Sequence, residues 1–304
     1  MVAIEVKDLV KRFGPTIAVD GVSFEVKSGE FFGFLGPNGA GKTTTIHMLS
    51  TLLRPTSGSA KINGYDVATQ ALQVRWSIGL VFQETTLDKD LTVYENLLFT
   101  CYLHHMTGRK AEERIEETLK VMDLMDRRND LVKKLSGGLK RRLDIARGIL
   151  HRPKVLFLDE PTIGLDPQAR IAIWAFIERL RAEEEMTVFL TTHYLDEAER
   201  CDRVGIIDYG KLIALGSPSA LKRMIKGEVV QLKTTEDQKL QDEIKRRFGV
   251  ATKRTEEGLF LEVESGEVFL PQLFQAFGSR ILSVNINRPS LNDVFIHLTG
   301  RGIR

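Results

Sequence analysis

The stretch GPNGAGKTT at residues 36–44 decides how this chain folds. It fits the pattern G-x-x-x-x-G-K-[ST], a loop that cradles phosphate groups. Gly36, Gly39 and Gly41 allow backbone conformations in which successive N–H groups converge on one point, and that point lies at a helix N-terminus, where unpaired amides favour an anion. Lys42 adds a positive charge for β- and γ-phosphates, and the Thr43 hydroxyl can bind Mg²⁺.

The residues on either side give this loop the context that a phosphate site needs. Phe31 to Leu35 form a short apolar strand before the loop, and Thr44 to Leu53 are predicted to continue it as a helix. A coincidental glycine-rich turn would need neither element. A phosphate site in an α/β fold is therefore the favoured interpretation.

The overall composition limits the class of protein. The chain has 304 residues, enough for one large domain or two, with 42% apolar and 28% charged residues, as in soluble globular proteins. A net charge of +2 argues against a nucleic-acid surface as the main function. Cys101 and Cys201 are far apart and are expected to be reduced thiols of a cytosolic protein. Residues 1–10 lack the pattern of a signal peptide, and no apolar run approaches the roughly 18 residues that cross a bilayer, so work at a membrane would need a partner.

Two strands are predicted before the phosphate loop, over Val2 to Leu9 and Ile17 to Val26. Phe13 stands between them. An aromatic side chain at this place could stack on a purine base, or it could be a core or edge-strand residue, and the residue alone favours neither interpretation.

A helical insertion follows the strand around Ile78 to Phe82, which ends at Gln83. Apolar positions recur at helical spacing in the next segments, so residues 84–149 are predicted to be helical throughout. The simplest interpretation of these apolar stripes is core packing.

The insertion ends in LSGGLKRRL at residues 135–143. Ser136, Gly137 and Gly138 come just before a helix predicted from about Leu139 to His151, so a hydroxyl and free amides again form an end that can bind an anion. Taken alone, the segment is more simply an N-cap with flexible glycines.

The segment VLFLDEPTIGLDP at residues 155–167 carries two adjacent carboxylates. Val155 to Leu158 is a continuous apolar run, typical of a parallel strand that is buried on both faces. Asp159 and Glu160 follow at its C-terminal end, where ligands of open α/β sheets gather. Asp159 is placed to hold Mg²⁺ and Glu160 to polarise an attacking water, and adjacent acids at this point make poor sense as packing.

The last third of the chain begins with another apolar strand, Thr187 to Thr192, and His193 stands at its end. A helix and a hairpin around residues 208–210 are predicted next.

From Gly227 on, strands and helices alternate as in a small, separate α+β domain, and a capping box at Ser290 and Asp293 opens its last helix. The glycine-bearing segment at Lys226 and Gly227 is the expected joint.

Taken together, these motifs resemble the ATPase subunit of an ABC transporter, over about three quarters of the chain from Val2 to roughly Leu221. Residues 36–44 resemble the Walker A loop, Gln83 the Q-loop, residues 135–143 the ABC signature and residues 155–161 the Walker B strand. GLDP at residues 164–167 resembles the D-loop, and His193 the switch histidine. Leu139 departs from the family, because the signature usually has glutamine there; we expect it to tune the rate or dimer affinity.

The resemblance implies a fold class and a set of site residues. The fold would be α/β, a RecA-like P-loop NTPase core with an antiparallel β subdomain and a helical insertion at about residues 84–150, together forming residues 1–226. A small α+β accessory domain would span residues 227–304. Implied cofactors are ATP and Mg²⁺. Catalytic roles would fall to Glu160, His193, Gln83 and Lys42, metal binding to Thr43, Gln83 and Asp159, and nucleotide binding to Phe13, Val19, Gly36, Pro37, Asn38, Gly39, Ala40, Gly41, Lys42, Thr43, Thr44, Ser136, Gly138 and Asp166.

The resemblance also implies partners. The phosphate loop and the signature of one chain cannot both face one nucleotide, so a second ATPase subunit, the same chain or a different one, would complete each site head to tail. Residues 191–204 and 289–301 are similar to those of drug-exporting ABC-2 ATPases of the daunorubicin and doxorubicin resistance type, which act with a separate integral-membrane permease at the inner face of the cell membrane. The alternative is an ABC ATPase that acts on a soluble or nucleic-acid partner.

Overall fold

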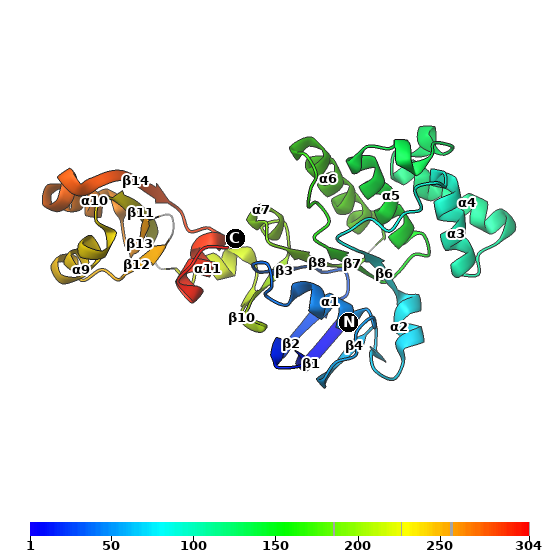
Figure 1. Ribbon diagram of the computed structural model, residues 1–304, viewed down its shortest axis with the longest axis horizontal. Coiled ribbons are helices and arrows are strands. Elements are labelled where there is room, and N and C mark those ends of the chain that lie inside the picture. The colour runs from blue at the N-terminus through cyan, green and yellow to red at the C-terminus, as the bar shows by residue number, and fades with distance from the viewer. Residues whose placement is uncertain (185, 226, 256–257, 304) are drawn as a thin grey trace.

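The structure, a computed structural model, describes residues 1–184, 186–225, 227–255 and 258–303 (Figure 1). Its centre is a six-stranded sheet in the order β10-β9-β3-β8-β7-β6. The strands from β9 to β6 run parallel, and β10 pairs with β9 in the antiparallel sense. Their bounds are β3 Phe31–Leu35, β6 Ile78–Val81, β7 Val155–Asp159, β8 Thr187–Thr192, β9 Arg203–Asp208 and β10 Lys211–Gly216.

Alternate residues of these strands fill two apolar cores, one on each face of the sheet. On one face, the ring of Phe32 of β3 stacks with Phe189 of β8 and with Phe24, and the ring of Phe34 packs on the same two rings at a tilt. On the other face, Phe31 packs on Trp174 of α6 (Pro167–Glu184). Because every residue of β3 and β7 is buried, these two strands are fixed in place, and their carboxyl ends meet at one edge of the sheet.

A second, antiparallel sheet flanks the first core, in the order β2-β1-β4-β5 (Figure 1, lower part). It consists of β1 Val2–Phe13, β2 Thr16–Lys27, β4 Ser57–Ile62 and β5 Tyr65–Asp66, and the helix α2 (Ala71–Ser77) follows. The strands predicted at 2–9 and 17–26 are confirmed, with longer ends. Strand β4 was not predicted, because only Ala60 and Ile62 of its residues are buried and its sequence SGSAKI is mostly polar.

Residues 84–149 contain no strand beyond a single bridge, and all of them are described, so the predicted helical insertion is confirmed. Its helices are α3 (Val93–Leu103), α4 (Gly108–Val121) and α5 (Gly137–Ile149), with 3-10 turns at Met125–Arg127 and Val132–Lys134. A capping box at Thr92 and Glu95 starts α3. The two cysteines, Cys101 and Cys201, are buried and do not form a disulfide in the described structure.

The C-terminal part is a β-α-β-β-α-β unit whose antiparallel sheet has the order β12-β13-β11-β14, the ferredoxin-like arrangement. Its elements are β11 Glu228–Thr234, α9 Asp237–Phe248, β12 Thr252–Thr255, β13 Gly258–Val263, α10 Gly266–Phe277 and β14 Ile281–Asn287. Strand β12 was not predicted, since its sequence TKRT has no apolar residue. Lys226, part of the expected joint, lies outside the described residues, and the division into residues 1–226 and 227–304 stays a prediction.

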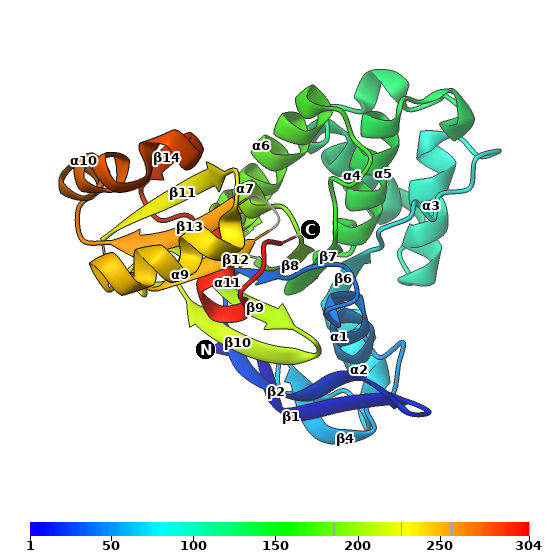
Figure 2. The same ribbon diagram turned by 60° about the vertical axis from the view of Figure 1, so that its left-hand side comes forward.

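The last described helix, α11 (Leu291–Thr299), lies between the C-terminal sheet and the core around the six-stranded sheet (Figures 1 and 2). Its buried residues Leu291, Val294, Phe295 and Ile296 belong to the same apolar core as Val229 and Phe260 of the C-terminal sheet and as Leu221 of α8 (Pro218–Lys222). Beyond it, Arg301 donates to Asp208 at the end of β9, with 2.7 Å between Nη2 and Oδ1. This helix therefore joins the two parts of the chain.

The predicted capping box of this helix is confirmed. Ser290 Oγ accepts from the Asp293 amide, and Asp293 accepts from the Ser290 amide at 2.8 Å. We expect Ser290→Ala to lower the free energy of unfolding by about 1 kcal/mol, because the Asp293 amide loses its acceptor and the Asp293 carboxylate loses the hydroxyl donor. Chemical denaturation followed by circular dichroism measures this effect. Ser290→Thr keeps the hydroxyl and is the control; an equal loss in both variants would contradict the capping role.

Candidate nucleotide site

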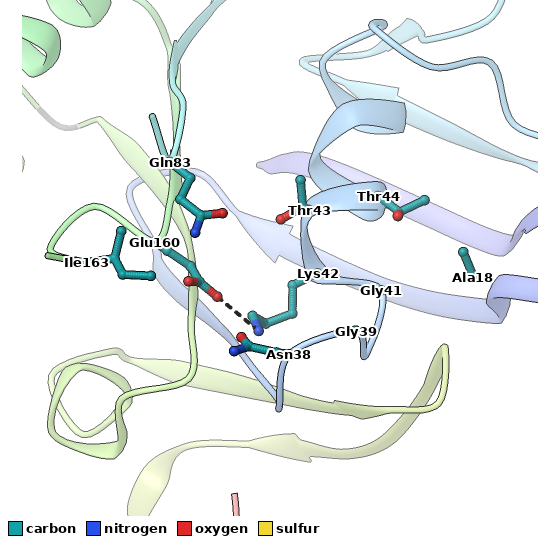
Figure 3. Close-up of a pocket in the computed structure, with 10 residues that line it drawn as sticks. All are labelled: Ala18, Asn38, Gly39, Gly41, Lys42, Thr43, Thr44, Gln83, Glu160 and Ile163. Carbon is teal, nitrogen blue, oxygen red and sulfur yellow. Dashed lines mark ion pairs between the residues drawn. The ribbon is translucent and has the colours of Figure 1, made fainter. Parts of the chain in front are cut away.

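The phosphate loop forms one wall of a pocket of about 340 Å³ at the carboxyl edge of the central sheet (Figure 3). The other wall comes from residues that follow β6 and β7, and these face Lys42 and Thr43 across the opening. The lining residues are Ala18, Asn38, Gly39, Gly41, Lys42, Thr43, Thr44, Gln83, Glu160 and Ile163. The helix α1 (Lys42–Leu49) starts inside the pocket, so its free amides point into it.

Two loop glycines are required by their surroundings. Gly41 has a φ of +104°, and a Cβ atom there would lie 2.4 Å from the Ala18 carbonyl oxygen. A Cβ atom on Gly36 would lie 2.3 Å from the Ile207 carbonyl oxygen. Since both obstacles are backbone atoms, any side chain at these positions would displace the strands that shape the loop.

Lys42 and Glu160 form a buried ion pair at the centre of the pocket (Figure 3). Lys42 Nζ lies 3.1 Å from Glu160 Oε1, and the two side chains are 4% and 7% exposed. The ammonium also donates to the carbonyl oxygens of Gly36 at 2.8 Å and Pro37 at 3.0 Å. Its position at the helix start and its full charge suit it to bind a phosphate group.

Asp159 is held by two hydroxyls. Its Oδ1 atom accepts from Thr191 Oγ1 at 2.5 Å and from Thr43 Oγ1 at 3.2 Å. The second contact joins the end of β7 to the phosphate loop. Thr43 and Gln83 line the pocket, and Asp159 contacts Thr43. Their side chains present a hydroxyl, an amide oxygen and a carboxylate, and oxygen atoms are the ligands that Mg²⁺ prefers.

Glu160 has a strained backbone. Its φ is +45°, which is unusual for a residue with a side chain, and its amide donates to the carbonyl and to the hydroxyl of Thr191, both at 3.1 Å. His193 Nδ1 lies 3.2 Å from Glu160 Oε1, an ion-pair distance when the imidazole is protonated. In this backbone conformation, the Glu160 carboxylate lies between Lys42 and His193.

Several predicted nucleotide contacts lie outside the pocket. Val19 has no exposed surface and packs in the core, whereas the neighbouring Ala18 lines the pocket, because successive strand residues face opposite sides. The contact of Val19 with the base or ribose stays a prediction. Phe13 does not line the pocket, but its ring is 49% exposed, with Lys11 Nζ 5.1 Å from the ring centre. Gly36, Pro37 and Ala40 shape the loop rather than line the cavity.

Ser136, Gly138 and Asp166 also lie outside the pocket. Ser136 is the N-cap of α5 and accepts from the Leu139 amide at 3.4 Å, and it is exposed. Asp166 is exposed as well and accepts from the Ala169 amide at 2.9 Å. The two helix starts that carry these residues are neighbours, because a Cβ atom on Gly138 would lie 3.1 Å from that of Ala169.

Sequence patterns did not predict the role of Glu197. This buried carboxylate accepts from Thr192 Oγ1 at 2.5 Å, from Trp174 Nε1 at 3.3 Å and from the Thr162 hydroxyl. Burial raises the pKa of Glu197. Through these hydrogen bonds, Glu197 connects Thr192, which ends β8 and precedes His193, to Thr162, two residues after Glu160. A lone glutamate in a short helical stretch gives no signal of such a role.

The fold and the pocket define a P-loop nucleotide-binding protein, and comparisons with known proteins define its family. Residues 19–163 match the family described as ABC transporter, and residues 216–299 match the C-terminal domain of ATP-binding proteins like DrrA1-3. The chain is 40% identical to the daunorubicin resistance ATP-binding protein DrrA3 of Streptomyces coeruleorubidus, over 98% of this chain and 96% of that one. It is 41% identical to the Nod factor export ATP-binding protein I of Burkholderia lata, over 98% and 97%.

Solved structures agree with this assignment. The structure of cbiO1 from Clostridium perfringens, part of the ABC transporter complex cbiONQ, is 26% identical with a TM-score of 0.68, over 82% of this chain and 96% of that one. The dimeric ATP-binding cassette MJ0796 bound to ADP and Pi is 29% identical with a TM-score of 0.64, over 70% and 98%. The chain belongs to the ATP-binding proteins of ABC transporters. It binds nucleotide and is an ATPase, and the predicted fold class is confirmed.

Proposed function

We propose that this chain is the ATP-hydrolysing subunit of an ABC exporter and that two ATPase subunits enclose each nucleotide. The observation that carries the proposal is the place of the signature residues: Ser136 and Gly138 form a helix start outside the pocket that holds Lys42. A second copy placed head to tail would bring its own Ser136 to the open side of the pocket. MJ0796, a similar cassette, forms a dimeric structure.

In this proposal the nucleotide phosphates lie on the loop amides and on Lys42. Thr43, Asp159 and Gln83 would hold Mg²⁺, which supplies charge to offset that of the phosphates. Glu160 polarises the attacking water, and His193, next to it, contacts the γ-phosphate. Hydrolysis removes a group that both copies bind, so the dimer opens.

The membrane partner would be a separate permease. Among the described helices, none is both long enough and apolar enough to cross a bilayer. A groove of about 300 Å³ lies between the helical insertion and the central sheet, lined by Leu80, Phe99, Leu103 and His104 among others. Phe99 and Leu103 are 58% and 61% exposed. Since β6 lines this groove at Leu80 and leads directly to Gln83, a permease segment there would sense the nucleotide pocket.

The relatives named for drug resistance and for Nod factor export support the export direction and a place at the inner face of the membrane. Co-expression with a candidate integral-membrane permease from the same genome tests the proposal. We expect a complex whose ATPase activity depends on Glu160. A soluble or nucleic-acid partner, with no membrane protein recovered, would contradict the transport function.

The adenine contact of Phe13 is a separate prediction. If its exposed ring stacks on the base, Phe13→Ala should weaken ATP binding by about 1 kcal/mol, roughly fivefold in Kd. Titration calorimetry with ATP measures this. Phe13→Tyr keeps the ring and is the control. An unchanged affinity for the alanine variant would leave Phe13 with a structural role at the end of β1 only.

A further inference from the structure

Arg141, on the signature helix α5, is a buried arginine that binds main-chain carbonyls rather than a nucleotide. It is 6% exposed. Its Nε donates to the Pro161 carbonyl at 2.5 Å, its Nη1 to the Phe82 carbonyl at 2.5 Å and its Nη2 to the Asp159 carbonyl at 3.4 Å. One guanidinium therefore bridges the ends of two neighbouring strands, β6 and β7.

The three carbonyls lie beside the two side chains that face Lys42 and Thr43. Phe82 directly precedes Gln83, and Asp159 and Pro161 are the residues on either side of Glu160. Glu160 holds a positive φ of +45°, a conformation that persists only when its surroundings fix it. Arg141 supplies part of this fixation by binding the main chain on both sides of that residue.

Arginine is the residue type suited to this place. Its planar fork of donors can reach three carbonyl oxygens at once, whereas the ammonium of lysine is a compact point charge. Burial lowers the pKa of Arg141, and the nearby carboxylates of Asp144 and Asp159 counteract this effect. A buried guanidinium is costly unless its donors are satisfied, so these contacts are specific.

The same helix starts at the exposed signature. Ser136 caps α5, and Arg141 lies little more than one turn further on. Because one short helix carries both residues, a displacement of its start by a contact at Ser136 would also displace Arg141. The helix thus has an exposed start for a second subunit and a buried arginine on the catalytic loops of its own chain.

We propose that Arg141 is a positioning residue that holds Gln83 and Glu160 in place for hydrolysis and ties both to the signature helix. This inference rests on the proposed dimeric ATPase. In that dimer, the partner's nucleotide at Ser136 would act, through Arg141, on the catalytic groups of the other site.

The test is the steady-state ATPase activity of Arg141→Met. We expect kcat to fall about 10- to 100-fold with KM for ATP nearly unchanged, because the phosphate loop is untouched while Gln83 and Glu160 lose their alignment. Arg114→Met is the matched control: Arg114 also donates to two carbonyls of this region, those of Ile149 and Leu150, but at the far end of α5. A similar loss of kcat in both variants, or wild-type kcat in Arg141→Met, would overturn the inference.

A double variant separates positioning from general stability. If Arg141 acts through Gln83, Arg141→Met should reduce kcat less in a Gln83→Ala background than in the wild type. Equal factors in both backgrounds would contradict this. ATP binding by each purified variant shows that it is folded. If Arg141→Met is insoluble, Arg141→Lys takes its place, with a partial loss of kcat expected and full activity overturning the inference.

The wild type and the variants Glu160→Gln and Arg141→Met together distinguish a failure of this inference from a failure of the proposed function. If the wild type hydrolyses ATP and its Glu160→Gln variant dimerises with ATP, a normal Arg141→Met enzyme rejects only the role of Arg141. If the wild type neither hydrolyses ATP nor dimerises with it, the proposed function itself fails.

Discussion

Replacing Glu160 with glutamine is expected to slow ATP hydrolysis by about 10²- to 10⁴-fold while ATP still binds. Glutamine keeps the size of the side chain and a carbonyl oxygen near Lys42, but it cannot accept a proton from water. The phosphate loop, with Gly36, Gly41 and Lys42, is unchanged. Bound ATP should therefore persist and hold two chains together, so the variant should elute as a dimer in Mg·ATP and as a monomer without nucleotide.

Size-exclusion chromatography with light scattering measures this dimer, and phosphate release measures turnover. Glu178→Gln is a suitable control, because Glu178 lies on α6 in an exposed ion pair with Arg200. It should behave as the wild type does. Normal turnover in Glu160→Gln would remove this residue from the chemical step, and a monomer in saturating Mg·ATP, with or without a permease, would reject the enclosed-nucleotide dimer.

Replacing Lys42 with alanine is expected to reduce ATP binding and hydrolysis together, by about 10²-fold or more. The ammonium is the only full positive charge among the residues that line the described pocket. Its removal also leaves the buried carboxylate of Glu160 without its cation at 3.1 Å, which adds a cost in stability. Both binding and folding should suffer.

Calorimetry with ATP and thermal unfolding distinguish these two effects. Lys42→Ala with Glu160→Gln removes both charges, so this double variant should recover stability but not ATP binding. Lys110→Ala, on the exposed side of α4, is the control and should change neither. ATP binding retained in Lys42→Ala would show that the loop amides alone hold the phosphates.

Local sequence patterns predicted the parts of the site whose residues lie together in one short stretch of the chain. The glycines, Lys42 and Thr43 occur in one short stretch, so their function can be inferred without knowing the fold. The strand that ends in Asp159 and Glu160 is apolar throughout and was equally clear. Strands β4 and β12 were missed because their few buried residues leave no alternating pattern.

The remaining contacts are tertiary, and no local pattern contains them. Val19 and Ala18 differ by one position, and only the register of β2 decides which of them reaches the pocket. Arg141 joins segments that lie 59, 18 and 20 residues away along the chain. Glu197 likewise collects hydroxyls from separate elements. Such networks become visible only when the sheet has brought the strand ends together.

Helix α11 follows its packing partners α8, β11 and β13 along the chain, and this order has a consequence for biosynthesis. The elements α8, β11 and β13 are synthesised, and emerge from the ribosome, before α11 does. Until residues 291–299 emerge, Val229 and Phe260 on one side and Leu221 on the other lack the part of their core that this helix supplies. Nascent chains cut short before residue 291 would expose this apolar surface to chaperones and proteases, so we expect them to be degraded rather than to accumulate.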